Sequence, residues 1–128
     1  MSGSYPQYSA RVTQAISGDD LMTFVELVTD DLYKKVRVRL DGVDTPDGYK
    51  QPKSTPAGAI REEVYGLAHG KDCKMDVVKQ SRKYWIVILH IPQEGGGFMN
   101  LNEYLKEKGF TYPRDKSNAQ KKVSQGGQ

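Results

Sequence analysis

The chain has 128 residues, which is enough for one small domain but too short for two independent cores. Hydrophobic residues make up 37% and charged residues 27%, proportions typical of a folded globular protein and not of a disordered or membrane-embedded one. The net charge of +3 is compatible with a nucleic-acid partner, and one cysteine with two histidines is too few for a Cys/His zinc site.

The N-terminal segment is polar and carries no apolar run. We expect residues 1–8 to be flexible and to hold no secretory signal. No stretch of the chain approaches the roughly 18 apolar residues that a membrane span needs. The sequence therefore predicts a cytoplasmic protein without a membrane partner, and secretion after processing stays open.

Three strands are predicted in the first third of the chain. Two β-favouring runs, Ser9–Ile16 and Leu21–Val28, flank the turn-forming Ser17–Asp20 and predict a hairpin. The third run, Lys34–Leu40, alternates strictly between aliphatic and basic residues. This pattern predicts a strand that buries an aliphatic face and holds the two arginines, Arg37 and Arg39, on the opposite face.

The rest of the chain predicts helices around a second hairpin. Thr55 and Pro56 are typical of a helix start, and Gly70 ends the apolar helical spacing that follows. Two further strands are expected at Lys74–Val78 and Tyr84–Ile91. A last helix is expected between Asn100, as its cap, and Gly109.

This order of elements indicates an α+β protein. Three strands, a helix, two strands and a closing helix fit a small five-stranded Greek-key β-barrel of the oligonucleotide-binding (OB) kind, with two or three helices. We expect the domain to cover residues 9–113. Residues 114–128 are rich in lysine, glycine and amide side chains, and they predict a basic disordered tail.

The densest group of polar residues follows the third strand, in the segment from Arg39 to Asp47. Asp44 and Asp47 stand on either side of Pro46, so their carboxylates can converge, as a hard cation such as Ca²⁺ requires. Asp19, at the first hairpin tip, can supply another oxygen. Arg39 offers a planar fork for a phosphate, and metal, arginine and carboxylate together can hydrolyse a phosphodiester. The alternative is that Asp-Thr-Pro-Asp is only a turn, because these residues favour turns.

Four segments resemble the staphylococcal nuclease (thermonuclease) family, in the family's order. Val38–Asp47 resembles its strand-to-turn signature, and Ile16–Asp20 resembles its upstream acidic hairpin. Ala59–Gly70 is similar to its first helix, and Leu101–Phe110 resembles its closing segment. The resemblance runs from about Arg11 to Tyr112. It implies an OB-fold barrel of the staphylococcal-nuclease kind and a calcium-dependent nuclease.

The resemblance also implies roles for single residues. Asp19 and Asp44 would be calcium ligands, with the Thr45 carbonyl as a third. Arg39 would bind the scissile phosphate, and Asp47 stands where the family has the glutamate that handles the attacking water. Asp47 is one methylene shorter than that glutamate.

The second hairpin departs from the family pattern. Where the family has Tyr-Gly-Arg, this chain reads Gln80 to Trp85, and Tyr84 falls at the position of the arginine. Arg82 or Lys83 would substitute for it if the turn is remodelled, although a shift by one residue turns a strand side chain to the opposite face. We take Arg82 as the second catalytic cation in this interpretation.

The first hypothesis is therefore a Ca²⁺-dependent endonuclease that hydrolyses DNA or RNA with little sequence preference and acts as a monomer. Its substrate is expected to be single-stranded, because aromatic side chains in a barrel groove suit unstacked bases. The predicted nucleic-acid contacts are Arg37, Lys83, Tyr84 and Tyr112. The tyrosines are equally well explained as half-buried barrel residues. The second hypothesis is an inactive module of the same fold that binds nucleic acid or a protein, and the altered second hairpin favours it.

Overall fold

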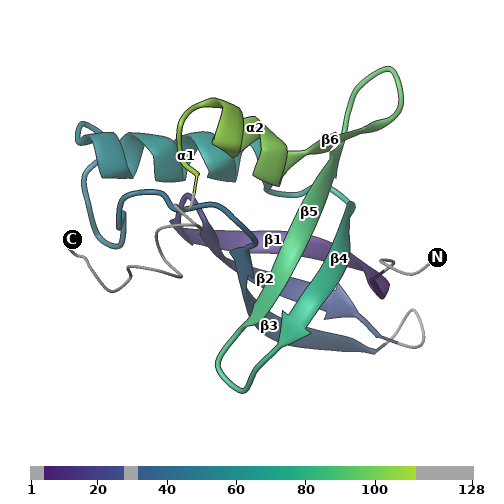
Figure 1. Cartoon of the computed structure of the whole chain (residues 1–128). Helices are drawn as coiled ribbons and strands as arrows, with labels where there is room; N and C mark the ends of the chain where they lie inside the picture. The colour runs from purple at the N-terminus through teal and green to yellow at the C-terminus, as the bar shows by residue number, and fades with distance from the viewer. Residues whose placement is uncertain (1–4, 28–31, 112–128) are drawn as a thin grey trace.

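The computed structural model describes residues 5–27 and 32–111, and it contains six strands and two helices (Figure 1). The elements are β1 (Gln7–Ser17), β2 (Asp20–Glu26), β3 (Tyr33–Leu40), α1 (Pro56–Ala68), β4 (Cys73–Gln80), β5 (Trp85–Pro92), β6 (Phe98–Asn100) and α2 (Leu101–Glu107). All five predicted strands and both predicted helices are present. The predicted end of the second strand at Val28, Tyr112 and the predicted tail at residues 114–128 lie outside the described residues.

The strands form a closed barrel. Their order in the sheet is β3-β2-β1-β4-β5-β6, and an additional pairing joins β3 to β5. The β3–β5 pairing is parallel, whereas the other pairings are antiparallel, so the barrel is mixed. A closed barrel of β1 to β5 with two helices confirms the predicted α+β class and an OB-like architecture.

The barrel core follows the predicted alternation of β3. Val36, Val38 and Leu40 are at most 5% exposed and face the interior. Arg37 and Arg39 lie on the outer face, as expected, because successive strand residues point to opposite sides. The single cysteine, Cys73, is fully buried on β4, and burial raises the pKa of its thiol to about 11.

Two strand features differ from the prediction. β1 begins at Gln7 because residues 7–10 pair with residues 73–76 of β4, a long-range contact that local sequence does not reveal. β6 was not predicted, because three residues are too few to show a period. It pairs with β5 across the loop that begins at Gln93.

The predicted helix caps are confirmed. The Thr55 hydroxyl accepts a hydrogen bond of 3.0 Å from the Gly58 N–H, and the Asn100 side chain accepts one of 3.0 Å from the Glu103 N–H. Gly58 also lets the loop approach α1, because a Cβ there would lie 1.9 Å from the Pro52 carbonyl oxygen. Both helices lie on the same side of the barrel (Figure 1).

A buried amide joins α2 to the barrel. Asn102 is 1% exposed, and its side chain accepts a 3.0 Å hydrogen bond from the Leu89 N–H. It also donates to the carbonyls of Asp41 and Val87, both at 3.0 Å. These bonds link α2, β5 and the end of β3, which is where the predicted site begins. No helix within residues 5–27 and 32–111 has the length and apolar character needed to cross a membrane.

Candidate functional site

A pocket of about 570 Å³ lies where the β1–β2 turn, the outer face of β3 and the turn after β3 meet. We call it the acid pocket. It is lined by Ile16, Ser17, Asp19, Asp20, Arg37, Arg39, Asp44, Thr45, Asp47 and Tyr49. Five residues predicted for catalysis or metal binding are therefore together, although they come from separate segments of the chain.

Asp19 lies at the tip of the first hairpin and is partly buried. Its carboxylate Oδ1 accepts a 3.0 Å hydrogen bond from the Thr45 hydroxyl, and its carbonyl accepts a 3.0 Å bond from the Leu40 N–H. Burial raises the pKa of Asp19 above its ordinary value, and the negative charges of Asp20 and Asp44 raise it further. Within the described part of the chain, no basic side chain forms an ion pair with Asp19. A bound cation would therefore stabilise the ionised carboxylate.

Gly18 permits this close approach between the hairpin and the turn. A Cβ at Gly18 would lie 2.9 Å from Thr45 Cγ2 and 3.2 Å from Ile60 Cγ1. A side chain at this position would therefore displace Thr45, which is itself 8% exposed. The absence of a side chain at Gly18 keeps the Thr45 hydroxyl beside Asp19.

The turn that carries Asp44 is held by the segment after α2. The Asp44 N–H donates to the Phe110 carbonyl at 2.9 Å, and Val43 forms an isolated antiparallel bridge with Thr111. The Asp44 side chain itself is exposed at the pocket. Its position is thus set by the backbone, and the carboxylate stays accessible to a ligand.

Asp47 is oriented by hydrogen bonds to its own turn and to β1. Its Oδ1 accepts from the Ser17 hydroxyl at 3.4 Å and from the Tyr49 N–H at 3.1 Å. The same Ser17 oxygen accepts from the Gly48 N–H at 2.9 Å. Ser17 was not among the predicted site residues. Its only sequence signal is its place before Gly18, where the resembling family carries an aspartate.

Asp20 is a second residue that the prediction missed, and it organises the two arginines. Its side chain is only 8% exposed and accepts two bonds from Arg37, 2.9 Å from Nε and 2.6 Å from Nη2. Arg39 Nη2 lies 3.8 Å from the same carboxylate. The strand register places Asp20 directly opposite Arg39, yet the bidentate pair forms with Arg37, its diagonal neighbour.

Arg39 remains available to a ligand. Its guanidinium carbon lies 4.8 Å from the centre of the Tyr84 ring, and its side chain is 50% exposed. Tyr84 also lines a smaller hollow of about 270 Å³ together with Asp19, Arg39 and Asp44. The carboxylate of Asp20 and the ring of Tyr84 thus hold a cationic fork that still faces solvent.

Arg82 and Lys83 do not line the acid pocket. They occupy the tip of the β4–β5 turn, where the Ser81 N–H and hydroxyl both donate to the Tyr84 carbonyl, at 3.0 and 2.6 Å. This tight turn keeps both side chains exposed, and they line a different groove, with Lys34, Lys35 and Arg37. The guanidinium group that lies over the Tyr84 ring is that of Arg39.

The donor atoms of the acid pocket suit a hard cation. Asp19 and Asp44 offer carboxylate oxygens, and the Thr45 carbonyl was expected as a third ligand. Water would complete such a shell, as is usual for Ca²⁺. Across residues 5–27 and 32–111, no three His, Cys, Asp or Glu side chains group closely enough to hold a metal by themselves.

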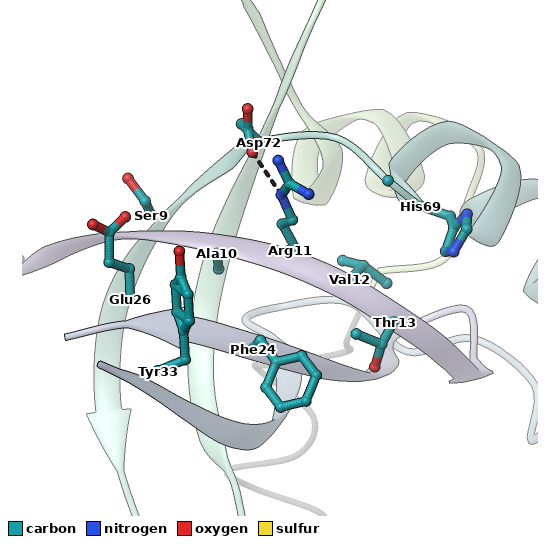
Figure 2. Close-up of a pocket in the computed structure, with 11 residues that line it drawn as sticks. Ser9, Ala10, Arg11, Val12, Thr13, Phe24, Glu26, Tyr33, His69 and Asp72 are labelled. Atoms are coloured by element: carbon teal, nitrogen blue, oxygen red, sulfur yellow. Dashed lines mark hydrogen bonds and ion pairs between the residues drawn. The ribbon is translucent and has the colours of Figure 1, made fainter. Parts of the chain in front are cut away.

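A groove of the same volume, about 570 Å³, lies between β1, β2 and the α1–β4 connection. We call it the β1–α1 groove. Figure 2 shows Phe24 and Tyr33 beside it and Arg11 joined to Asp72 on its rim. The Arg11–Asp72 distance is 2.7 Å, and both side chains are exposed. None of the predicted site residues that the structure describes lines this groove.

Comparison with known proteins adds no family assignment. No family model matches the chain, and no curated protein matches it. The resemblance to staphylococcal nuclease therefore stays an expectation from the four sequence segments, and the structure shows an OB-like barrel.

Proposed function

We propose that the chain is a Ca²⁺-dependent nuclease of the staphylococcal-nuclease kind, acting as a monomer on single strands of DNA or RNA. The observation that carries this proposal is the meeting of Asp19, Asp44 and Arg39 in the acid pocket. Two carboxylates that have no basic partner among the described residues, next to an exposed arginine, suit a metal ion and a phosphate together. Since these groups would contact the phosphate and not the bases, and the phosphate is the same in every sequence, little sequence preference is expected.

In this proposal the residues of the pocket have distinct tasks. Asp19, Asp44 and the Thr45 carbonyl would hold Ca²⁺, which supplies positive charge to the phosphoryl oxygens when bound. Arg39 binds the non-bridging oxygens of the same phosphate with its fork, in an orientation that Tyr84 and Asp20 support. The arginine thereby stabilises the charge that develops as water adds to phosphorus.

Asp47 is the residue proposed to accept the proton of that water. Its Oδ1 is fixed by Ser17 and Tyr49, so the carboxylate has a defined orientation. The water oxygen bonds to phosphorus and the bond to the leaving oxygen breaks. The leaving oxygen takes a proton from solvent, because Arg82 lies in the other groove.

The second candidate is a module that binds nucleic acid without cleaving it. Two observations favour it: Arg82 is outside the acid pocket, and Asp20 neutralises Arg37. Of the two arginines that line the pocket, only Arg39, whose contact with Asp20 is longer at 3.8 Å, then stays open to a ligand. Loss of one charge-stabilising group typically lowers a rate by about a hundredfold to a thousandfold.

The test is cleavage of labelled single-stranded DNA and RNA with Ca²⁺, with Mg²⁺ and with chelator. The nuclease proposal expects calcium-dependent cleavage that Asp44→Ala abolishes. Asp72→Ala, a matched change in the β1–α1 groove, should cleave like the wild type. Equal product from wild type and Asp44→Ala would reject the nuclease and leave the binding module.

A further inference from the structure

A second groove lies between the first half of β3 and the β4–β5 turn, with a volume of about 430 Å³. We call it the basic groove. Its charged lining residues are all cationic, namely Lys34, Lys35, Arg37, Arg82 and Lys83. Among residues 5–27 and 32–111 no acidic residue lines it, whereas aspartates dominate the neighbouring acid pocket.

The groove exists because β3 is only partly covered on one side. β3 pairs with β2 from Tyr33 to Arg39, but it pairs with β5 only from Val38 to Leu40. On that side the segment 34–37 therefore faces the β4–β5 turn and has no paired strand. This recess holds the lysines of β3 and the cations of the turn together.

Four of the five cations have no acidic partner in the part of the chain that the structure describes. Arg37 is neutralised by Asp20. Within residues 5–27 and 32–111, no ion pair joins Lys34, Lys35, Arg82 or Lys83 to an acidic side chain. Lys34 Nζ lies 5.8 Å from the centre of the Trp85 ring. Like charges held together repel one another, so a bound polyanion would stabilise this surface.

The basic groove adjoins the acid pocket. Arg37 lines both, and Tyr84 lines both the groove and the hollow beside Arg39. A phosphate bound at Arg39 therefore has the groove next to it. The neighbouring phosphates of the same strand would meet Lys34, Lys35, Arg82 and Lys83.

We infer that the basic groove binds the backbone of one nucleic-acid strand on one side of the phosphate held in the acid pocket. The inference rests on the proposed function in one respect, that the strand in the groove is the substrate of the pocket. A recess with Tyr84 and Trp85 in its lining suits an unstacked single strand better than a flat membrane surface. In this assignment Arg82 binds substrate at a distance from the reacting phosphate.

The test separates binding from cleavage. Fluorescence anisotropy measures the affinity of a labelled oligothymidylate of about fifteen nucleotides in chelator, over a series of salt concentrations. The groove variant is Lys34→Gln with Lys83→Gln. The control is Lys53→Gln with Lys71→Gln, which removes the same charge from exposed positions that line none of the described grooves. Trp85, the only tryptophan, gives a second readout by its fluorescence, since it lines the groove.

The groove variant should bind the oligonucleotide about tenfold more weakly than the wild type. The slope of log K against log salt concentration should become shallower by about 0.7 for each lost phosphate contact. The control should bind like the wild type. Lys34→Arg with Lys83→Arg should retain affinity, which separates loss of charge from misfolding. Trp85 emission should change when the strand binds to wild type.

Two outcomes would overturn the inference. Equal weakening in groove variant and control would show that affinity follows net charge alone. Competition by polyglutamate as strong as that by the oligonucleotide would show a surface for acidic polypeptides. Cleavage is measured separately from binding. A protein that binds the strand in the basic groove but does not cleave it would reject the nuclease proposal and leave this inference in place.

Discussion

The acid pocket and the β1–α1 groove have the same volume, about 570 Å³, but their charges are arranged differently. In the β1–α1 groove the rim charges Arg11 and Asp72 neutralise each other in solvent, with exposed fractions of 63% and 77%. In the acid pocket Asp19 has no basic partner among the described residues, and Arg39 faces solvent. The two regions therefore differ in how their charges are paired and not in volume.

The largest effect is expected for the arginines of the two regions. Arg39→Ala should lower the cleavage rate about a hundredfold or more, because it removes the fork that stabilises charge on the phosphate. Arg11→Ala should leave the rate within about twofold, since an exposed ion pair contributes little. Initial rates on one labelled strand at saturating Ca²⁺ measure both. Comparable losses in the two variants would remove the distinction between the regions.

The aspartates should differ in their contribution to stability. Asp20→Asn should lower the free energy of unfolding by about 2 kcal/mol, because a buried carboxylate loses its bidentate bond to Arg37. Asp72→Asn removes an exposed charge and should leave the urea midpoint unchanged. Urea unfolding followed by Trp85 fluorescence makes the measurement. An unchanged midpoint for Asp20→Asn would mean that the pair does not organise the pocket.

Gly18→Ala tests the close approach that places Thr45 beside Asp19. The new methyl group would overlap Thr45 and Ile60, so we expect a loss of about 1–2 kcal/mol and weaker calcium dependence of cleavage. Gly66→Ala is the control, because a Cβ there meets nothing within 4 Å and α1 gains helix propensity. It should be as stable as the wild type or slightly more so. Thermal unfolding with and without Ca²⁺ compares the two.

The smallest effect concerns the pH dependence of stability in calcium-free buffer. The pKa of Asp19 is raised from 3.8 in the folded state, chiefly by burial. Between 3.8 and the raised value the folded protein holds a proton that the unfolded chain has released, so stability falls as pH rises. The stability of Asp19→Asn relative to the wild type should therefore increase as the pH rises from acid to neutral. Parallel stability curves for the two proteins would contradict this.

The strands and helices could be predicted from short stretches of sequence because their strongest signals, strand alternation and helix caps, involve neighbouring residues. The alternation of Val36, Val38 and Leu40 sets the faces of β3, and Thr55 and Asn100 cap their helices through neighbouring N–H groups. β6 and the early start of β1 were missed because each depends on a partner strand. Pairing across the barrel is not visible in any short window of the chain.

The candidate site was predicted in part for the same reason. The motifs placed Asp19, Arg39, Asp44, Thr45 and Asp47 together, and the structure brings all of them to the acid pocket. Asp20 was missed because it acts through a hydrogen-bonded contact with Arg37, its diagonal neighbour on the adjacent strand. The position of Arg82 depends on the shape of a tight turn, which residue type alone does not define.

The buried amide of Asn102 has a consequence for the order in which the molecule takes shape. It bonds to the carbonyl of Asp41, 61 residues earlier, just beyond the strand that ends beside the acid pocket. During synthesis, the ribosome releases the aspartates and arginines of the pocket long before this amide emerges. The parallel β3–β5 closure must likewise wait for residue 87. A nascent chain therefore carries every charged group of the pocket before it can hold them in place, and any catalytic competence would arise late.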